Sequence, residues 1–378
     1  MKKRSVSFLL VVSVALTVCN LSIAALAQDQ NIDHSHAIYT RIPPHSYFPV
    51  SNGPEVTPLT QWTFTFTYQG TKYSDVFVGT DPSKTNTTTN VPWGIIPIKM
   101  VFGASNGNMT FDPNTIYSGN MTATEMINGS ILFHSDVDYV QGGTDLGTTQ
   151  YEDAYQRGDF WEDVKTNTNY HILFPKAVIA PEQTFKVPSS EGSVFINPFG
   201  IAGGATVGVA NINWFDAQLQ TVIAKFPQIK PNTFPIFITY NVYLSGDSGL
   251  GGCCIGGYHS ANAGPPNGQT YSYATTITQN PKEAVFSQDI SALSHEIGEW
   301  IMDPFTTNGS PCGILEVGDP LENLANFGDF PYTVNGFTYH PQDLVFIDYF
   351  GASTGLTVNG WYTFQNETAA NGVCTFGS

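Results

Sequence analysis

The segment 294–300 reads Ser-His-Glu-Ile-Gly-Glu-Trp and places a histidine and two glutamates close together. His295 and Glu299 are four residues apart, so on a helix both side chains project from one face, about 6 Å apart. That separation lets two side chains hold one ion between them, with Glu296 beside the pair. A His and a Glu at this spacing more often form a solvated ion pair worth a few tenths of a kcal/mol. The surrounding sequence must therefore decide between a metal site and a surface ion pair.

The flanking residues predict an amphipathic helix through this segment. At about 100° per residue, one narrow stripe is apolar and the opposite side is polar. The apolar stripe contains Ile290, Leu293, Ile297 and Ile301, and the polar side contains His295, Glu299 and Asp303. We expect Ser287 or Asp289 to cap the start of this helix and Pro304 to end it.

The motif resembles the His-Glu-x-x-His signature of the zincin metallopeptidases, with Glu299 in place of the second histidine. In that signature the outer residues bind zinc and the inner glutamate is the general base. The resemblance therefore implies His295 and Glu299 as metal ligands and Glu296 as the catalytic base that activates water. Because a carboxylate replaces an imidazole, the site is harder and more anionic. Zinc (Zn²⁺) is the expected ion, and calcium and manganese are the alternatives.

The resemblance extends beyond the motif. The wider frame, which adds Asp303-Pro304 and Glu316-Val-Gly-Asp319, is similar to zincin-related secreted bacterial proteins and, more distantly, to the plant EXORDIUM (phosphate-induced) family. In the gluzincin branch of the zincins the third ligand is an acidic residue roughly twenty positions after the motif. Glu316 and Asp319, which lie 17 and 20 positions after Glu299, are the matching residues here.

Several further residues are candidates for roles at such a site. The third ligand could instead be Asp303, His259 or His340, and an oxyanion partner is sought among Tyr258, His259, Tyr339 and His340. Each acidic residue also has a possible structural role, because carboxylates often cap helices or order turns.

The first 27 residues predict a secretory signal peptide. Lys2, Lys3 and Arg4 precede an apolar run over 6–16, and Ala25-Leu26-Ala27 supplies small residues for cleavage. No later segment reaches the length of a membrane span. We therefore expect a secreted or periplasmic protein.

Composition supports export and excludes some partners. Without residues 1–27 the chain keeps 11 basic and 31 acidic residues, a net charge of −20. Such a charge argues against binding nucleic acid or anionic lipid through a basic surface. Only 12% of the residues are charged, whereas 13% are aromatic and 36 are glycines, a composition typical of β-rich extracellular proteins.

Four cysteines follow the signal segment: Cys253, Cys254, Cys312 and Cys374. An even number in an oxidising compartment predicts two disulfides. Adjacent cysteines are poorly placed to bond each other. We therefore expect one of the adjacent pair to bond Cys312 and the other to bond Cys374.

About 350 mature residues favour two domains. We predict a β-rich domain over 28–190 and a zincin-like domain over 191–378, an α+β protein in all. The first contains expected strands at 61–68, 72–78 and 93–102, the last at a sheet edge because of its prolines, and a helix at 150–161. The second contains an expected helix at 213–226, strands at 234–244 and 271–277, and then the motif helix. This order of backing helix, small sheet and motif helix is the one that the zincin resemblance implies.

The predicted function is a secreted metal-dependent hydrolase, a zincin-like metallopeptidase that acts on a peptide or protein. The competing hypothesis is a non-catalytic cell-surface or matrix-binding protein on a zincin frame that has lost catalysis.

Overall fold

The computed structural model describes residues 57–196, 205–278, 287–322, 324, 328–352, 355–367 and 369–376. These residues contain both strands and helices, so the mixed α+β class is confirmed. None of the described helices is long and apolar enough to cross a membrane. The predicted signal peptide lies outside the described residues.

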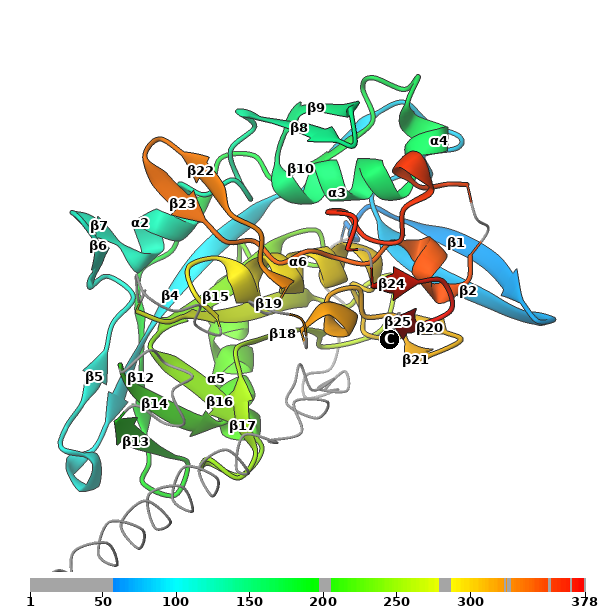
Figure 1. Ribbon diagram of the computed structural model, residues 1–378. Helices are drawn as coiled ribbons and strands as arrows, with labels where there is room; N and C mark the ends of the chain where they lie inside the picture. Colours follow the sequence, from blue (N-terminus) through cyan, green and yellow to red (C-terminus); the bar gives the residue numbers. More distant parts are fainter. Residues whose placement is uncertain are drawn as a thin grey trace, which may run out of the picture. The chain divides into compact units, whose positions relative to one another are not determined.

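The centre of the fold is a seven-stranded sheet whose main path runs β11-β4-β15-β19-β18, with β12 and β5 also paired to β4 (Figure 1). Strands β4, β15 and β19 are parallel, and β18 is antiparallel to β19. The strands are β4 Trp93–Phe102, β5 Thr110–Phe111, β11 Val178–Ile179, β12 Gln183–Val187, β15 Phe234–Tyr240, β18 Gly257–Ala261 and β19 Thr270–Thr276.

Strand β4 lies inside this sheet, so its predicted edge position is wrong. On one side β4 pairs with β15, including Pro97 opposite Ile238. On the other side, pairing with β11 stops at Ile95 and pairing with β12 starts at Ile98. Pro97 therefore falls at the gap between two partner strands, where its missing N–H interrupts no ladder.

The predicted domain boundary near residue 190 falls between β12 and β13. Strand β4, from the predicted first domain, is hydrogen-bonded to β15 from the predicted second domain. All the described residues belong to one compact unit. The two halves of the sequence thus build one sheet and contribute jointly to its cores.

Helices cover both faces of the central sheet. Side chains alternate along a strand, so neighbouring residues of β15 face opposite sides of the sheet. Ile236 and Ile238 join the core that contains Ile297 of helix α6 (Ser291–Met302). Phe237 joins the core that contains Phe215 of helix α5 (Ile212–Lys225). The helices predicted at 213–226 and at the motif are confirmed.

Helix α6 is anchored on the sheet through Trp300, whose ring stacks on Phe234 at the start of β15, with centroids 3.8 Å apart. All four residues of the predicted apolar stripe are buried. The predicted N-cap is wrong: α6 follows Ile290 with no capping side chain. The Asp289 carboxylate accepts instead from the backbone N–H of Ile290 and of His340.

A second sheet has the order β13-β14-β16-β17, with strands Gly192–Ile196, Thr206–Asn211, Val242–Ser245 and Cys253–Ile255. Asn241, with φ of 53°, separates β15 from β16. The single strand predicted over 234–244 is therefore two strands in two sheets.

Short two-stranded sheets complete the fold. The hairpin β1 Gln61–Tyr68 with β2 Thr71–Val78 confirms the predicted hairpin, and the helix predicted at 150–161 is α3 Tyr151–Asp159 followed by α4 Trp161–Val164. The remaining strands are β3 Thr88–Asn90, β6 Ile116–Ser118, β7 Met121–Thr122, β8 Val137–Gln141, β9 Thr144–Thr149, β10 His171–Leu173, β20 Gly309–Ser310, β21 Gly313–Ile314, β22 Tyr332–Val334, β23 Phe337–Tyr339, β24 Ala370–Asn371 and β25 Thr375–Phe376. The remaining helical segments are α2 Ala123–Asn128, η2 Ala104–Asn106, η4 Asp319–Leu321, η6 Ile347–Phe350 and η7 Val358–Gly360.

The disulfide pairing differs from the predicted one. Cys253 is bonded to Cys254, and Cys312 is bonded to Cys374. The adjacent pair lies on β17 in the second sheet, whereas Cys312 lies between β20 and β21. Neither predicted bond, from the adjacent pair to Cys312 or from the adjacent pair to Cys374, is present. The loop after the motif helix is instead bonded directly to the C-terminal segment.

Candidate metal centre

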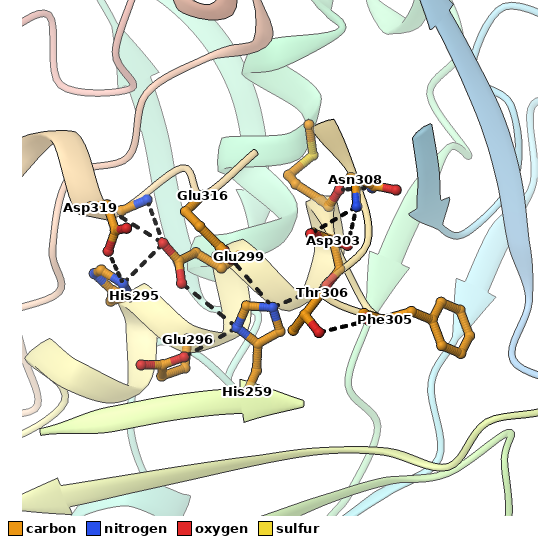
Figure 2. A network of polar contacts seen from close by, with 12 residues as sticks. His259, His295, Glu296, Glu299, Asp303, Phe305, Thr306, Asn308, Glu316 and Asp319 are labelled. Carbon is orange, nitrogen blue, oxygen red and sulfur yellow. Dashed lines mark hydrogen bonds and ion pairs between the residues drawn. The ribbon is translucent and has the colours of Figure 1, made fainter. Parts of the chain in front are cut away.

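Helix α6 turns its polar side toward other parts of the chain, so this side is not a solvated surface. His295, Glu296 and Glu299 are each 0% exposed. Figure 2 shows them facing His259, from β18, and Glu316 and Asp319, which follow the helix in sequence. The side chain of Asp319 is 41% exposed, so the cluster reaches solvent at this residue.

His295 has two carboxylate neighbours, Glu299 and Asp319. Nε2 of His295 lies 3.0 Å from Oε1 of Glu299 and 3.7 Å from Oδ1 of Asp319. Glu322 also offers an oxygen, since its ligand atom and those of His295 and Asp319 all lie within 4.8 Å of one another. Metal–ligand bonds of about 2.0–2.2 Å place ligand atoms about 3–4 Å apart around an ion. The distances from His295 to Glu299 and to Asp319 both fall in this range.

Gln342 fixes the orientation of the His295 ring. Nε2 of Gln342 donates to the carbonyl of Gly318, so its Oε1 is the acceptor that faces Nδ1 of His295 at 2.8 Å. Nδ1 therefore carries a proton, and Nε2 is the atom turned toward Glu299 and Asp319. A metal-binding histidine ordinarily has this outer hydrogen bond, which selects its tautomer.

The charges of His295 and Glu299 stabilise each other. Burial alone would lower the pKa of His295, but the Glu299 carboxylate outweighs it and the pKa lies above its usual value. Burial would raise the pKa of Glu299, and the charge of His295 lowers it below its usual value. In this state a proton on His295 Nε2 occupies the position that a cation would take.

Glu296 lies beside this ligand set. One atom from each of His295, Glu296 and Glu299 lies within 4.8 Å of the other two. Oε2 of Glu296 is 3.3 Å from Nδ1 of His259, and Oε1 accepts no hydrogen bond from any described residue. Burial, and then the charge of Glu299, raise the pKa of Glu296 well above its usual value. Gly257 makes room for this side chain, because a Cβ there would lie 2.7 Å from Cγ of Glu296.

His259 and Glu316 lie on the other side of Glu299. Nδ1 of His259 is 3.6 Å from Oε2 of Glu299, and Nε2 is 4.0 Å from Oε2 of Glu316. His259 reaches this position from β18, whereas its neighbour Tyr258 points to the opposite face and donates to Asp216 on α5. Adjacent strand residues face opposite ways, so only His259 of this pair belongs to the site.

Asp303, His340 and Tyr339 have structural partners away from the cluster. The Asp303 carboxylate accepts from the backbone N–H groups of Thr307 and Asn308, which orders the turn after α6. His340 pairs with Asp289 at 2.6 Å, and the Tyr339 hydroxyl donates to the carbonyl of Gly129. The side chains of these three predicted candidates therefore have other contacts, and Asp303 meets the cluster through its backbone carbonyl, 3.0 Å from Nε2 of His259.

Sequence reasoning missed three residues of the cluster: Gly318, Glu322 and Gln342. Glu322 follows Asp319 by three positions across the 3-10 turn η4, where residues three apart share a side. The spacing of Asp319 and Glu322 in the sequence could therefore have identified Glu322 as a neighbour of Asp319. Gly318 packs on the His295 ring, since a Cβ there would lie 2.3 Å from Nδ1. Nothing in the sequence around Gln342 marks it as the partner of His295.

The cluster as a whole fits a cation. It contains five carboxylates, those of Glu296, Glu299, Glu316, Asp319 and Glu322. Among the described residues, the salt bridges of these groups are with the two histidines and none is with Lys or Arg. Five of their oxygens accept no hydrogen bond within the described chain: Oε1 of Glu296, Oε2 of Glu299, Oε2 of Glu316, Oδ1 of Asp319 and Oε1 of Glu322. Buried acceptors without donors are costly unless a proton or a cation satisfies them.

No family profile, curated protein or solved structure matches this chain.

Proposed function

We propose that this chain is a metal-dependent hydrolase, with His295, Glu299 and Asp319 as the ligands of a divalent cation and a peptide or protein as substrate. One observation carries the proposal. The buried His295 ring, oriented by Gln342, places Nε2 3.0 Å from the buried carboxylate of Glu299 and 3.7 Å from the partly exposed carboxylate of Asp319. A helix that only formed a surface ion pair would leave these groups in solvent.

The ligand set contains one imidazole and two or three carboxylates, which suits zinc or manganese. When bound, such a cation polarises a carbonyl oxygen and lowers the pKa of water. The side chain of Asp319 is 41% exposed, so a substrate would approach the cluster from the side of Asp319. Gly318 and Asp319 donate their backbone N–H groups to Oε1 of Glu299 at 3.1 and 3.4 Å, which holds that ligand in place.

Glu296 is the proposed general base. Its Oε1 atom has no hydrogen-bond donor among the described residues and is the atom available to take a proton from water. A raised pKa suits proton transfer near neutral pH. Its Oε2 atom faces His259, which holds the carboxylate orientation.

The order of elements supports a zincin-like arrangement as part of this proposal. Helix α5 covers one face of the central sheet and α6 the other, and the motif residues follow β18 and β19 in the chain. Secretion belongs to the same proposal, and its support is the basic, apolar and small-residue pattern of residues 1–27.

The test is turnover of a broad peptide library, read by mass spectrometry, for the wild-type protein and the Glu296→Gln variant. We expect cleavage by the wild type, a loss of at least ~100-fold in the variant, and unchanged metal content. Glu162→Gln is the matched control, because Glu162 is an exposed residue paired with Lys165. Cleavage by Glu296→Gln at the wild-type rate would contradict the proposal. A metal-binding protein with no cleavage in any form would favour the non-catalytic binding protein.

A further inference from the structure

Glu299 lies between two histidines, and each of its carboxylate oxygens faces one of them (Figure 2). Oε1 is 3.0 Å from Nε2 of His295, and Oε2 is 3.6 Å from Nδ1 of His259. One carboxylate therefore takes part in two sets of metal-ligating atoms, of which the His295 set is the site described above.

His259 is oriented in the same manner as His295. Its Nε2 atom lies 3.0 Å from the carbonyl oxygen of Asp303, and a carbonyl oxygen only accepts, so Nε2 carries the proton. The lone pair of the neutral ring is then on Nδ1, which lies 3.3 Å from Oε2 of Glu296 and 3.6 Å from Oε2 of Glu299. Both rings use one nitrogen for an outer hydrogen bond and turn the other toward the shared carboxylate, as metal ligands do.

Glu316 completes the second set. One ligand atom from each of His259, Glu299 and Glu316 lies within 4.8 Å of the other two, and Oε2 of Glu316 approaches the His259 ring from the side of Nε2, at 4.0 Å. The Glu316 side chain is only 10% exposed, and its Oε2 atom accepts no hydrogen bond from the described residues. Oε2 of Glu299 likewise accepts none. A proton shared by Glu296 and His259 would satisfy the 3.3 Å contact between them but would leave both of these oxygens without a donor.

We propose that a second divalent cation binds between His259, Glu299 and Glu316, so that Glu299 bridges two cations. The inference rests on the proposed function for the first cation, which shares Glu299. Charge favours a second cation. The five carboxylates have no Lys or Arg partner among the described residues, so a net negative charge remains around one divalent ion, and a second ion offsets most of that charge. Nitrogen and oxygen ligands suit zinc or manganese. Paired cations about 3.5–4 Å apart are the arrangement of two-metal hydrolases, in which both ions contact the reacting oxygens.

The test is the number of Mn²⁺ ions bound by the full-length protein after equilibrium dialysis, measured by elemental mass spectrometry. Glu316→Gln removes a ligand from the second set alone, and Asp319→Asn removes one from the first set alone. We expect about two ions per wild-type chain, about one in each variant, and about two in the Glu162→Gln control. Electron paramagnetic resonance of the wild type should show two magnetically coupled Mn²⁺ ions, and each variant should give the signal of a single ion. Circular dichroism on each variant confirms that it is folded.

If the wild type and Glu316→Gln each bind one ion and Asp319→Asn binds none, there is no second site. The proposed function would remain intact. A single ion in the wild type that is retained in Asp319→Asn and lost in Glu316→Gln would rule out the first site and, with it, the shared centre. Two ions without magnetic coupling would overturn the bridging role of Glu299.

Discussion

Replacing Gly318 with alanine should weaken cation binding without changing any ligand. The added Cβ would lie 2.3 Å from Nδ1 of His295 and 2.6 Å from its Cγ and Cε1, whereas ordinary contacts begin near 3.4 Å. The ring or the loop must therefore move by about 1 Å. Gly318 has φ of −92°, which any residue adopts, so the backbone itself does not oppose the change.

The size of the effect follows from the contacts of the His295 ring. A shift of this size breaks the 2.8 Å hydrogen bond between Nδ1 and Gln342. Loss of such an outer partner costs roughly 10–100-fold in metal affinity. Overpacking in the buried site should also lower the free energy of unfolding of the metal-free protein by about 1–3 kcal/mol.

The assay is zinc affinity by competition with a chromogenic chelator, combined with thermal unfolding in the presence of excess chelator. The first measurement reports the ligand geometry and the second reports the packing cost alone. Gly246→Ala is the matched control, because a Cβ at Gly246 would meet nothing within 4 Å. Wild-type zinc affinity in Gly318→Ala would refute the assignment of His295 as a ligand in the orientation described.

Three further predictions concern charge and covalent linkage. Zinc affinity should fall as the pH drops below about 7, because burial and the charge of Glu299 raise the pKa of Asp319 to about 7 and a proton then competes with the cation. Calorimetry in buffers of different ionisation enthalpy should detect proton release on zinc binding at pH 6. The absence of proton release would contradict this prediction. The Asp75→Asn variant should be more stable than the wild type above pH 6. Burial raises the pKa of Asp75 from 3.8 to about 6, so the free energy of unfolding of the wild type falls by about 3 kcal/mol as the pH rises between these values. Urea unfolding at pH 4 and pH 8 should show the gain in stability only at pH 8. Replacing both Cys312 and Cys374 with serine should lower the free energy of unfolding by about 4 kcal/mol, since this disulfide spans 62 residues. The same change at Cys253 and Cys254 releases no long loop and should cost less. Equal losses for the two double variants in urea unfolding would contradict the chain-entropy explanation.

Local periodicity was sufficient to predict the elements that hold the site. The apolar stripe of Ile290, Leu293, Ile297 and Ile301 predicted α6, and the alternation over 61–78 predicted the β1–β2 hairpin. The spacing of His295 and Glu299 also predicted their contact, because four residues make about one helical turn. These features depend only on neighbours in sequence.

Features that depend on distant contacts were not predictable in the same way. His259 joins the cluster because β18 is paired with β19 beneath α6, and its alternation with Tyr258 selects the side chain that faces the helix. Asp289 was expected to cap α6, but its carboxylate is also bound by His340, 51 residues away. Pro97 indicated an edge strand because sequence does not reveal the gap between β11 and β12.

The disulfides illustrate the same limit. Cys312 and Cys374 meet because the short sheets β20–β21 and β24–β25 bring their turns together, with the backbone N–H of Cys374 donating to the carbonyl of Tyr349. Cys253 and Cys254 lie on β17 in another sheet, where no other described cysteine is present. Pairing thus followed the packing of elements that are distant in sequence, which the spacing of the cysteines does not encode.

An anomalous-difference map of zinc-soaked crystals would show whether His295, Glu299 and Asp319 bind a divalent cation. Data collected above and below the zinc absorption edge would locate the ion without reference to activity. We expect a peak about 2.0–2.2 Å from Nε2 of His295 and from an oxygen of Glu299, with Nδ1 of His295 still bonded to Gln342. A map without a peak at His295, with the His295–Glu299 contact retained at about 3.0 Å, would show a buried ion pair in place of a metal centre.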